Sequence, residues 1–129
     1  MAVFTHTIGR TWSGAGLSLS SSKAYSAAAE YNFSESLGGA ETDTEIACVL
    51  DVTEIKAVYF CATQDMTVEW NDNIGSQGSI SLLANEPLVW HTDSYYTNLL
   101  TPDITAFFVT NASGSTGVID FRCVIDPTP

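Results

Sequence analysis

Apolar and polar residues alternate along most of this chain with a period of two, which is typical of β-strands with one buried face. In the segment 117–126 the apolar residues alternate with Asp120, Arg122 and Asp126, so one face of the predicted strand is polar. The segment 104–109 is apolar on both faces, which predicts a strand that lies deeper. The stretch between them is rich in Gly, Ser and Asn, and we expect the two strands to pair as a hairpin.

Turn-forming residues separate the other predicted strands. These strands are 45–50, 55–63, 66–70, 79–83 and 87–91. The alternation from Tyr25 to Phe33 favours one more strand, although the alanine-rich stretch 24–29 could also form a helix. No segment has the pattern of a long amphipathic helix, so the sequence predicts an all-β fold: a single antiparallel β-sandwich or jelly-roll-like domain.

The first 43 residues differ from the rest because they are rich in Ser, Ala and Gly and poor in large aliphatic residues. The segment 2–12 is expected to form an edge strand or an arm, with a turn or flexible join at 11–16. Leu17 and Leu19 alternate with serines, as in an exposed strand. We therefore predict that residues 1–43 form an extended N-terminal arm and edge strands, and that residues 44–129 form the sandwich core of the same domain.

One side chain of each alternating pair should point between the two sheets. The predicted core consists of Ile46, Cys48, Leu50, Val58, Phe60, Met66, Val68, Trp70, Ile80, Leu82, Leu88, Trp90, Phe108, Ile119, Phe121, Cys123 and Ile125.

The chain carries 15 acidic and 4 basic residues, for a formal charge of −11. The basic residues are scattered along the sequence, so we expect no basic patch and no binding of nucleic acid or of anionic membranes. The sequence has neither a signal-like segment nor an apolar run long enough to cross a bilayer, which predicts production in a cytoplasm-like compartment. The charge favours a basic protein partner, or an assembly whose members must stay soluble.

Cys48, Cys61 and Cys123 lie inside predicted strands without close-pair spacing. We interpret them as buried reduced thiols, with a zinc site or a disulfide as the alternatives. His6 and His91 are the two histidines, and neither a metal-binding set nor a nucleophile with its base can be assembled around them. No catalytic residue, metal or cofactor is therefore predicted.

Calcium is an alternative, because Asp65, Asp72 and Asp93 sit at predicted loop ends. The regular spacing of calcium loops is missing, and solvated turn residues explain these carboxylates more simply.

The aromatic residues offer candidates for a contact surface. Trp70 and Trp90 are in phase with core positions and are assigned to packing. Four other aromatic residues are not assigned to the core by the pattern, and we predict that they bind a partner: Phe4, Trp12, Tyr95 and Tyr96.

The order of several short segments resembles that of small β-rich virion proteins of tailed bacteriophages, including capsid decoration, or cement, proteins. The segments are 50–52 (LDV), 55–59 (IKAVY), 66–71 (MTVEWN), 87–90 (PLVW), 100–104 (LTPDI), 108–114 (FVTNASG) and 121–126 (FRCVID). The resemblance implies a non-enzymatic protein, made in the host cytoplasm, that binds the major capsid protein on the capsid exterior and stabilises the head. It also implies a homo-oligomer, with a trimer favoured.

A second hypothesis is a carbohydrate- or receptor-binding module of a head fibre or tail, with Trp12, Tyr95 and Tyr96 as its platform. An orphan hydrolase is a third class, and the lack of convergent His, Ser and Asp residues disfavours it.

Overall fold

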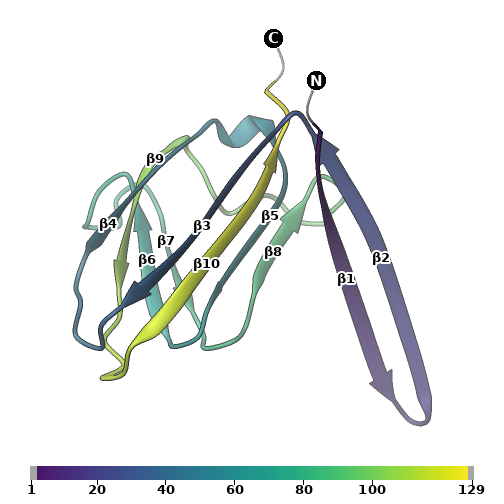
Figure 1. Ribbon diagram of the computed structural model, residues 1–129, viewed down its shortest axis with the longest axis horizontal. Helices are drawn as coiled ribbons and strands as arrows, with labels where there is room; N and C mark the ends of the chain where they lie inside the picture. Colours follow the sequence, from purple (N-terminus) through teal and green to yellow (C-terminus); the bar gives the residue numbers. More distant parts are fainter. Residues whose placement is uncertain (1–2, 128–129) are drawn as a thin grey trace.

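The computed structural model describes residues 3–127 and consists of a β-sandwich from which one long hairpin projects (Figure 1). The strands are β1 (Phe4–Gly14), β2 (Leu17–Ala27), β3 (Ala29–Leu37), β4 (Thr44–Leu50), β5 (Ile55–Ala62), β6 (Met66–Trp70), β7 (Ser79–Leu82), β8 (Leu88–His91), β9 (Ile104–Thr110) and β10 (Gly117–Ile125). One 3-10 turn, η1 (Val52–Glu54), joins β4 to β5.

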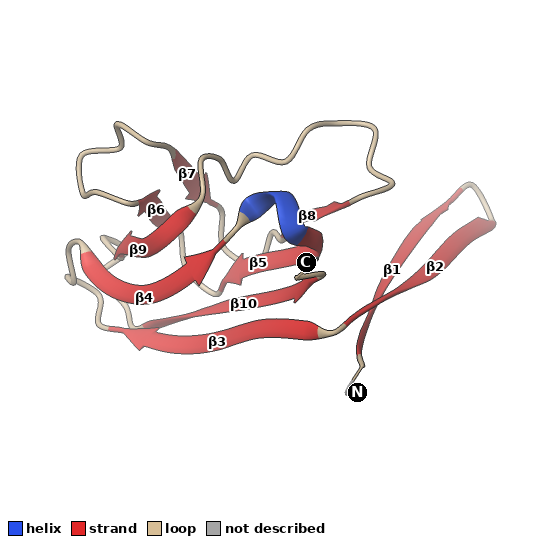
Figure 2. Ribbon diagram, turned by 90° about the horizontal axis from the view of Figure 1, so that it is seen from above, coloured by secondary structure: helices blue, strands red, loops and turns tan. Residues whose placement is uncertain are grey.

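Eight of the strands form two four-stranded antiparallel sheets, with the orders β3-β10-β5-β8 and β4-β9-β6-β7. The two sheets face each other as two layers (Figure 2). The pairing is nested: β3 pairs with β10, β4 with β9, β5 with β8, and β6 with β7. This is the connectivity of a jelly roll, and it confirms the all-β antiparallel sandwich that the sequence predicts.

The alanine-rich stretch 24–29 is extended, so its interpretation as strand is confirmed. A bend at Ala28 divides the stretch between β2 and β3. Residues 4–27 form the projecting arm, and β3 is an edge strand of the first sheet. Ala2, which the predicted arm included, lies outside the described residues.

Phenylalanines at the centre of the sandwich tie the two sheets together. Phe60 and Phe121 come from the first sheet and Phe107 comes from the second, and all three are fully buried. The ring centroids of Phe60 lie 5.2 Å from Phe107 and 5.0 Å from Phe121, in edge-to-face arrangements. Such pairs add to the hydrophobic gain of burying the rings.

The predicted hairpin between segments 104–109 and 117–126 is wrong. β9 pairs with β4 and β6 in one sheet, whereas β10 pairs with β3 and β5 in the other. The connection between them crosses from one sheet to the other and is held by Asn111, whose buried Nδ2 donates to the carbonyls of Leu37 (3.1 Å) and Ser115 (2.9 Å). Alternation identifies the buried face of each strand but not its partner.

The predicted core is largely confirmed, with one error in β9. Phe108 is only partly buried on the outer face, while Phe107 is fully buried. The ladder between β4 and β9 shifts its register between Ala47 and Leu50. Because of this irregularity, the alternation of core-facing and outward-facing residues shifts by one position along β9. Ile80, Leu88, Trp90 and Ile125 pack against the core from partly buried positions.

Candidate functional site

The arm is a regular β-hairpin that extends away from the sandwich. Its two strands pair from Phe4↔Ala27 to Gly14↔Leu17 without interruption, over a length of about 35 Å. Ala15 and Gly16 form the turn, with φ values of 51° and 77°. Positive φ at both central residues matches the twist of a tight hairpin. The arm starts beside the sandwich and diverges from it toward the tip (Figure 1).

The two faces of the arm differ sharply in their side chains. One face carries only small residues: Thr5, Thr7, Gly9, Thr11, Ser13, Ser18, Ser20, Ser22, Ala24 and Ser26. The other face carries the large and charged ones, among them Phe4, His6, Ile8, Arg10, Trp12, Leu17, Leu19, Lys23 and Tyr25. The face of the arm with the large and charged side chains is therefore the one suited to contacts with a partner.

Large apolar side chains are exposed at the tip on that face. Trp12 is 79% exposed, Leu17 71% and Leu19 70%. Trp12 and Leu19 are direct register partners, so the three form one apolar cluster, called here the tip cluster. A two-stranded hairpin is only marginally stable in water, and exposed apolar clusters of this kind mark contact surfaces.

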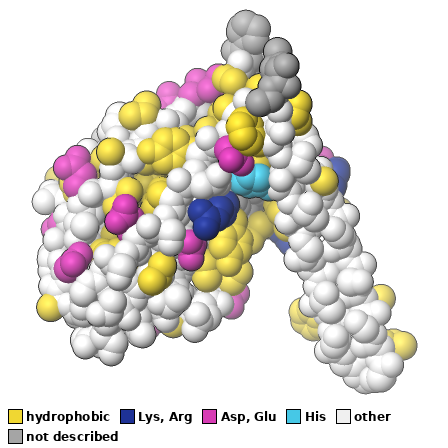
Figure 3. All heavy atoms as spheres, in the orientation of Figure 1, with side chains coloured by type: hydrophobic (Ala, Val, Ile, Leu, Met, Phe, Trp, Pro, Cys, Tyr) yellow, Lys and Arg dark blue, Asp and Glu magenta, His cyan; other side chains and the backbone are white. Residues whose placement is uncertain are grey.

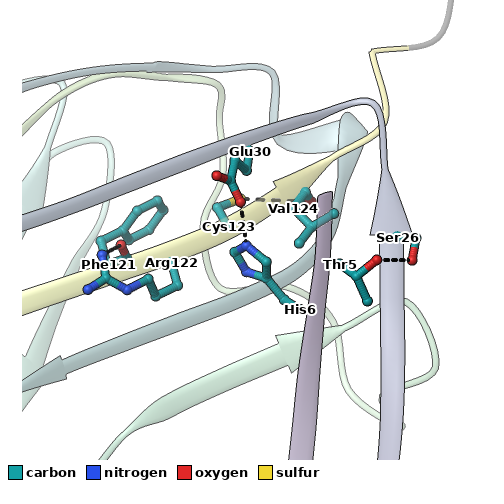
Figure 4. A network of polar contacts seen from close by, with 8 residues as sticks. All are labelled: Thr5, His6, Ser26, Glu30, Phe121, Arg122, Cys123 and Val124. Atoms are coloured by element: carbon teal, nitrogen blue, oxygen red, sulfur yellow. Dashed lines mark hydrogen bonds and ion pairs between the residues drawn. The ribbon is translucent and has the colours of Figure 1, made fainter. Parts of the chain in front are cut away.

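At the base, polar contacts hold the arm against the sandwich. His6 on β1 reaches Glu30 on β3, with 2.7 Å between Nε2 and Oε2 (Figure 4). The hydrogen bond to His6 is the main reason why the pKa of Glu30 lies below its usual value. Thr5 and Ser26 join the two strands of the arm on the opposite face.

A second contact centres on Tyr25, which is 5% exposed. Its hydroxyl lies 3.0 Å from Oδ2 of Asp93 and 2.8 Å from Nδ1 of His91. The ionised carboxylate can only accept, so the single hydroxyl proton goes to Asp93 and the His91 Nδ1–H donates to the Tyr25 oxygen. Burial is the main cause that lowers the pKa of His91, so this imidazole is neutral near pH 7.

Asp93 also accepts an ion pair from Lys23, and its pKa is lowered, first by the hydrogen bond from Lys23 and then by that from Tyr25. The loop after β8 is thereby tied to the arm.

Between the arm and the outer face of the first sheet lies a cleft of about 740 Å³. It is lined by His6, Thr7, Ile8, Gly9 and Arg10 of the arm and by Ala57, Val58, Tyr59, Pro87, Val89, Tyr96 and Arg122 of the sandwich. None of these residues is acidic. Figure 3 shows histidine, acidic and basic side chains close together where the arm leaves the body. Arg10 of the arm and Arg122 of β10 both line this cleft.

The four predicted contact residues do not form a single site. Phe4 is partly buried at the base of the arm, and Trp12 is exposed near the tip. Tyr95 is fully exposed on the connection after β8. Tyr96, 51% exposed, lines the cleft and donates its hydroxyl to the carbonyl of Val89 at 2.7 Å.

The loop carboxylates considered for calcium are used by the chain itself. Asp65 accepts from the backbone of Ala84 at 2.7 Å, and Asp72 accepts from the backbones of Ile74 and Ser76. Within residues 3–127 no group of three or more His, Cys, Asp or Glu side chains is arranged to hold a metal ion. Asp93 is engaged by Lys23 and Tyr25, as described above.

The three thiols are free. Cys48 and Cys123 are buried, and burial raises the pKa of each to about 12. Both are therefore protonated at neutral pH and pack as small apolar side chains. Cys61 is partly buried.

The geometry defines a class of molecule: a jelly-roll sandwich with a projecting hairpin arm and a cleft at the junction. In comparisons with known proteins, no family model, curated protein or solved structure matches the chain. Among residues 3–127, no helix has the length and apolar character needed to span a membrane.

Proposed function

We propose that this protein is a non-enzymatic structural component of a bacteriophage virion, a capsid decoration protein that binds the major capsid protein lattice and stabilises the head. The observation that carries the proposal is the arm, a long hairpin whose tip cluster of Trp12, Leu17 and Leu19 stands exposed to solvent. Burying these side chains on a neighbouring subunit would gain about 1.5–3 kcal/mol for each. The choice of the major capsid protein as partner rests on the resemblance of segments 50–126 to phage virion proteins.

A second feature supports attachment through the arm. The outer edges of β1 and β2 pair with no other strand among the described residues, so either edge could add a partner strand. Main-chain bonding of this kind, combined with anchoring side chains, is a common way to bind an extended segment. When many copies bind one capsid lattice, the modest stabilisation from each contact adds up.

The test is binding to purified capsid shells. The double variant Trp12→Ala, Leu19→Ala removes most of the tip cluster and should lower shell binding by at least about tenfold, as expected for loss of interface anchors. The matched control is Thr11→Ala, Ser20→Ala, a register pair on the small-residue face of the arm. Co-sedimentation measures binding, and heat release of the packaged genome measures stabilisation. Equal binding by the tip variant and the wild type would refute the proposal.

The alternative is a carbohydrate- or receptor-binding module of a head fibre or tail. It is favoured by the full exposure of Tyr95 and by the place of Tyr96 beside the cleft. Jelly rolls occur in both viral capsids and lectins, so the fold does not decide between them. Glycan-array binding that is lost on Tyr96→Ala would support the alternative, whereas uniform density over the shell in electron micrographs would support decoration.

A further inference from the structure

Charge is divided unequally between the arm and the rest of the chain. All 15 acidic residues lie beyond residue 28, together with only two basic ones, Lys56 and Arg122. The body therefore has a formal charge of −13. The arm carries Arg10 and Lys23 without any acidic residue, for a charge of +2. Such segregation creates opposite potentials on two parts of one surface.

No acidic residue lines the cleft, although Glu30 is bonded to the lining residue His6 and its pKa is lowered in part by the charge of Arg122. Arg10 makes no ion pair with any of residues 3–127, while Arg122 reaches one oxygen of Asp120 at 3.3 Å. The charge of Arg10 adds to the effect of burial in lowering the pKa of His91, and it partly offsets the raised pKa of Tyr25, whose main cause is burial. Apolar side chains also line the cleft, among them Ile8, Tyr59 and Val89. A ligand that carries carboxylates beside an apolar group would match this lining.

A surface with this composition exists on the opposite side of the same molecule. On the outer face of the second sheet, Phe108 is the register partner of both Glu45 on β4 and Glu69 on β6. The three residues therefore form a row across three strands, with the outer two Cα atoms roughly 10 Å apart. Burial is the main cause that raises the pKa of Glu69, followed by the charge of Asp43, a hydrogen bond with Asp43 and the charge of Asp72, as expected for crowded carboxylates.

We propose that the cleft between the arm and the sandwich binds the Glu45–Phe108–Glu69 row of a second copy of this chain. Arg10 and Arg122 pair with the two glutamates, and the apolar lining of the cleft receives the Phe108 ring. The arm folds over the neighbour and holds it against the first sheet.

The two surfaces lie on opposite outer faces of the sandwich, so the contact is head-to-tail. Such a contact closes into a ring or continues as a chain, depending on the rotation between successive copies. Trp12, Leu17 and Leu19 share the arm face with Arg10 but do not line the cleft, so the two proposals assign different residues to the two contacts. This inference therefore goes beyond the proposed function and does not depend on it.

The experiment measures self-association of the full chain by sedimentation velocity over a range of concentrations. The measurements are made at roughly 50 mM and roughly 500 mM salt, because screening weakens a charge-driven contact. Wild-type protein should associate at low salt and dissociate at high salt. Arg10→Glu and Arg122→Glu should each weaken association by at least about tenfold, since each places a carboxylate opposite a carboxylate.

The matched control is Lys56→Glu, which changes the net charge equally but lies outside the cleft. It should associate as the wild type does, and circular dichroism should show the same fold for all variants. A charge exchange gives a sharper result: the Glu45→Lys, Glu69→Lys variant, mixed with the Arg10→Glu, Arg122→Glu variant, should recover association that neither shows alone.

Three outcomes would overturn the inference: a wild-type monomer at every concentration in low salt, equal association by the arginine variants, or an equal loss with Lys56→Glu. Each is separable from failure of the proposed function. The Trp12→Ala, Leu19→Ala variant should still self-associate, and the arginine variants keep the tip cluster that binds the shell.

Discussion

Asn111 is the one buried amide or charged residue among residues 3–127, and it fixes the crossing between the sheets. Besides its two donated bonds, its Oδ1 accepts from the backbone of Ser113 at 3.2 Å. Asn111→Ala would leave the carbonyls of Leu37 and Ser115 without this donor and would open a small cavity. We expect the free energy of unfolding to fall by about 2–3 kcal/mol.

Chemical denaturation monitored by circular dichroism measures this loss. The control is Asn73→Ala in the exposed β6–β7 connection, which should change stability by no more than about 0.5 kcal/mol. If both variants unfold at the same denaturant concentration, the side chain of Asn111 does not hold the crossing.

At the residue scale, the sequence separates buried from exposed positions well but does not reveal the roles of polar residues. In the sequence, Asn111 looks like any turn residue, because an asparagine in a turn-rich segment predicts a turn whether its side chain faces water or the core. Trp12 is predicted as a contact residue from its type alone. Arg10 and Arg122 are 112 positions apart in the sequence, and only the fold brings them together.

At the scale of elements, the base of the arm should respond to pH through His91. This imidazole is packed against the ring of Tyr25, with 5.1 Å between centroids, and faces Asp93, Arg10 and Lys23. Its pKa in the folded protein lies below the value of about 6.5 expected in the unfolded chain. The unfolded state therefore binds more protons over this interval, and stability falls as the pH drops below about 6.5.

The measurement is thermal unfolding at pH 7.5 and pH 5.5 for the wild type and for His91→Phe, which keeps a ring at this position. The wild type should lose more stability on acidification than the variant does. Glu30 and Asp93 have lowered pKa values and stay ionised over this range, and His6 is present in both proteins, so the difference isolates His91. Parallel pH profiles would contradict this assignment.

Pairing between elements is the part of the fold that local pattern does not encode. Alternation places nearly every strand, because each strand buries one face against the other sheet. The jelly roll, however, pairs β3 with β10 and separates β9 from β10, and these choices depend on contacts between distant segments. The arm was predictable as an exposed strand from its serines and threonines, whereas its pairing as a separate two-stranded sheet was not.

At the scale of the whole molecule, the arm and the sandwich should differ in local stability. Apart from Tyr25 and Ala27 at the base, none of the arm's described residues is buried. By contrast, β10 is bonded on both sides and contributes Ile119, Phe121 and Cys123 to the core. Segments with few buried contacts open at low free energy, while core strands open only with global unfolding.

We therefore expect backbone amides of β1 and β2 to exchange with deuterium at least about a hundredfold faster than those of β10, a difference of roughly 2.7 kcal/mol in opening free energy. Hydrogen exchange followed by mass spectrometry of peptides measures both segments in the free protein under one set of conditions. Binding to capsid shells should slow exchange near the tip, whereas self-association should slow it near Arg10 and Arg122. An arm as protected as β10 in the free monomer would mean that the hairpin is stable without a partner, and the main physical reason for assigning it a docking role would be lost.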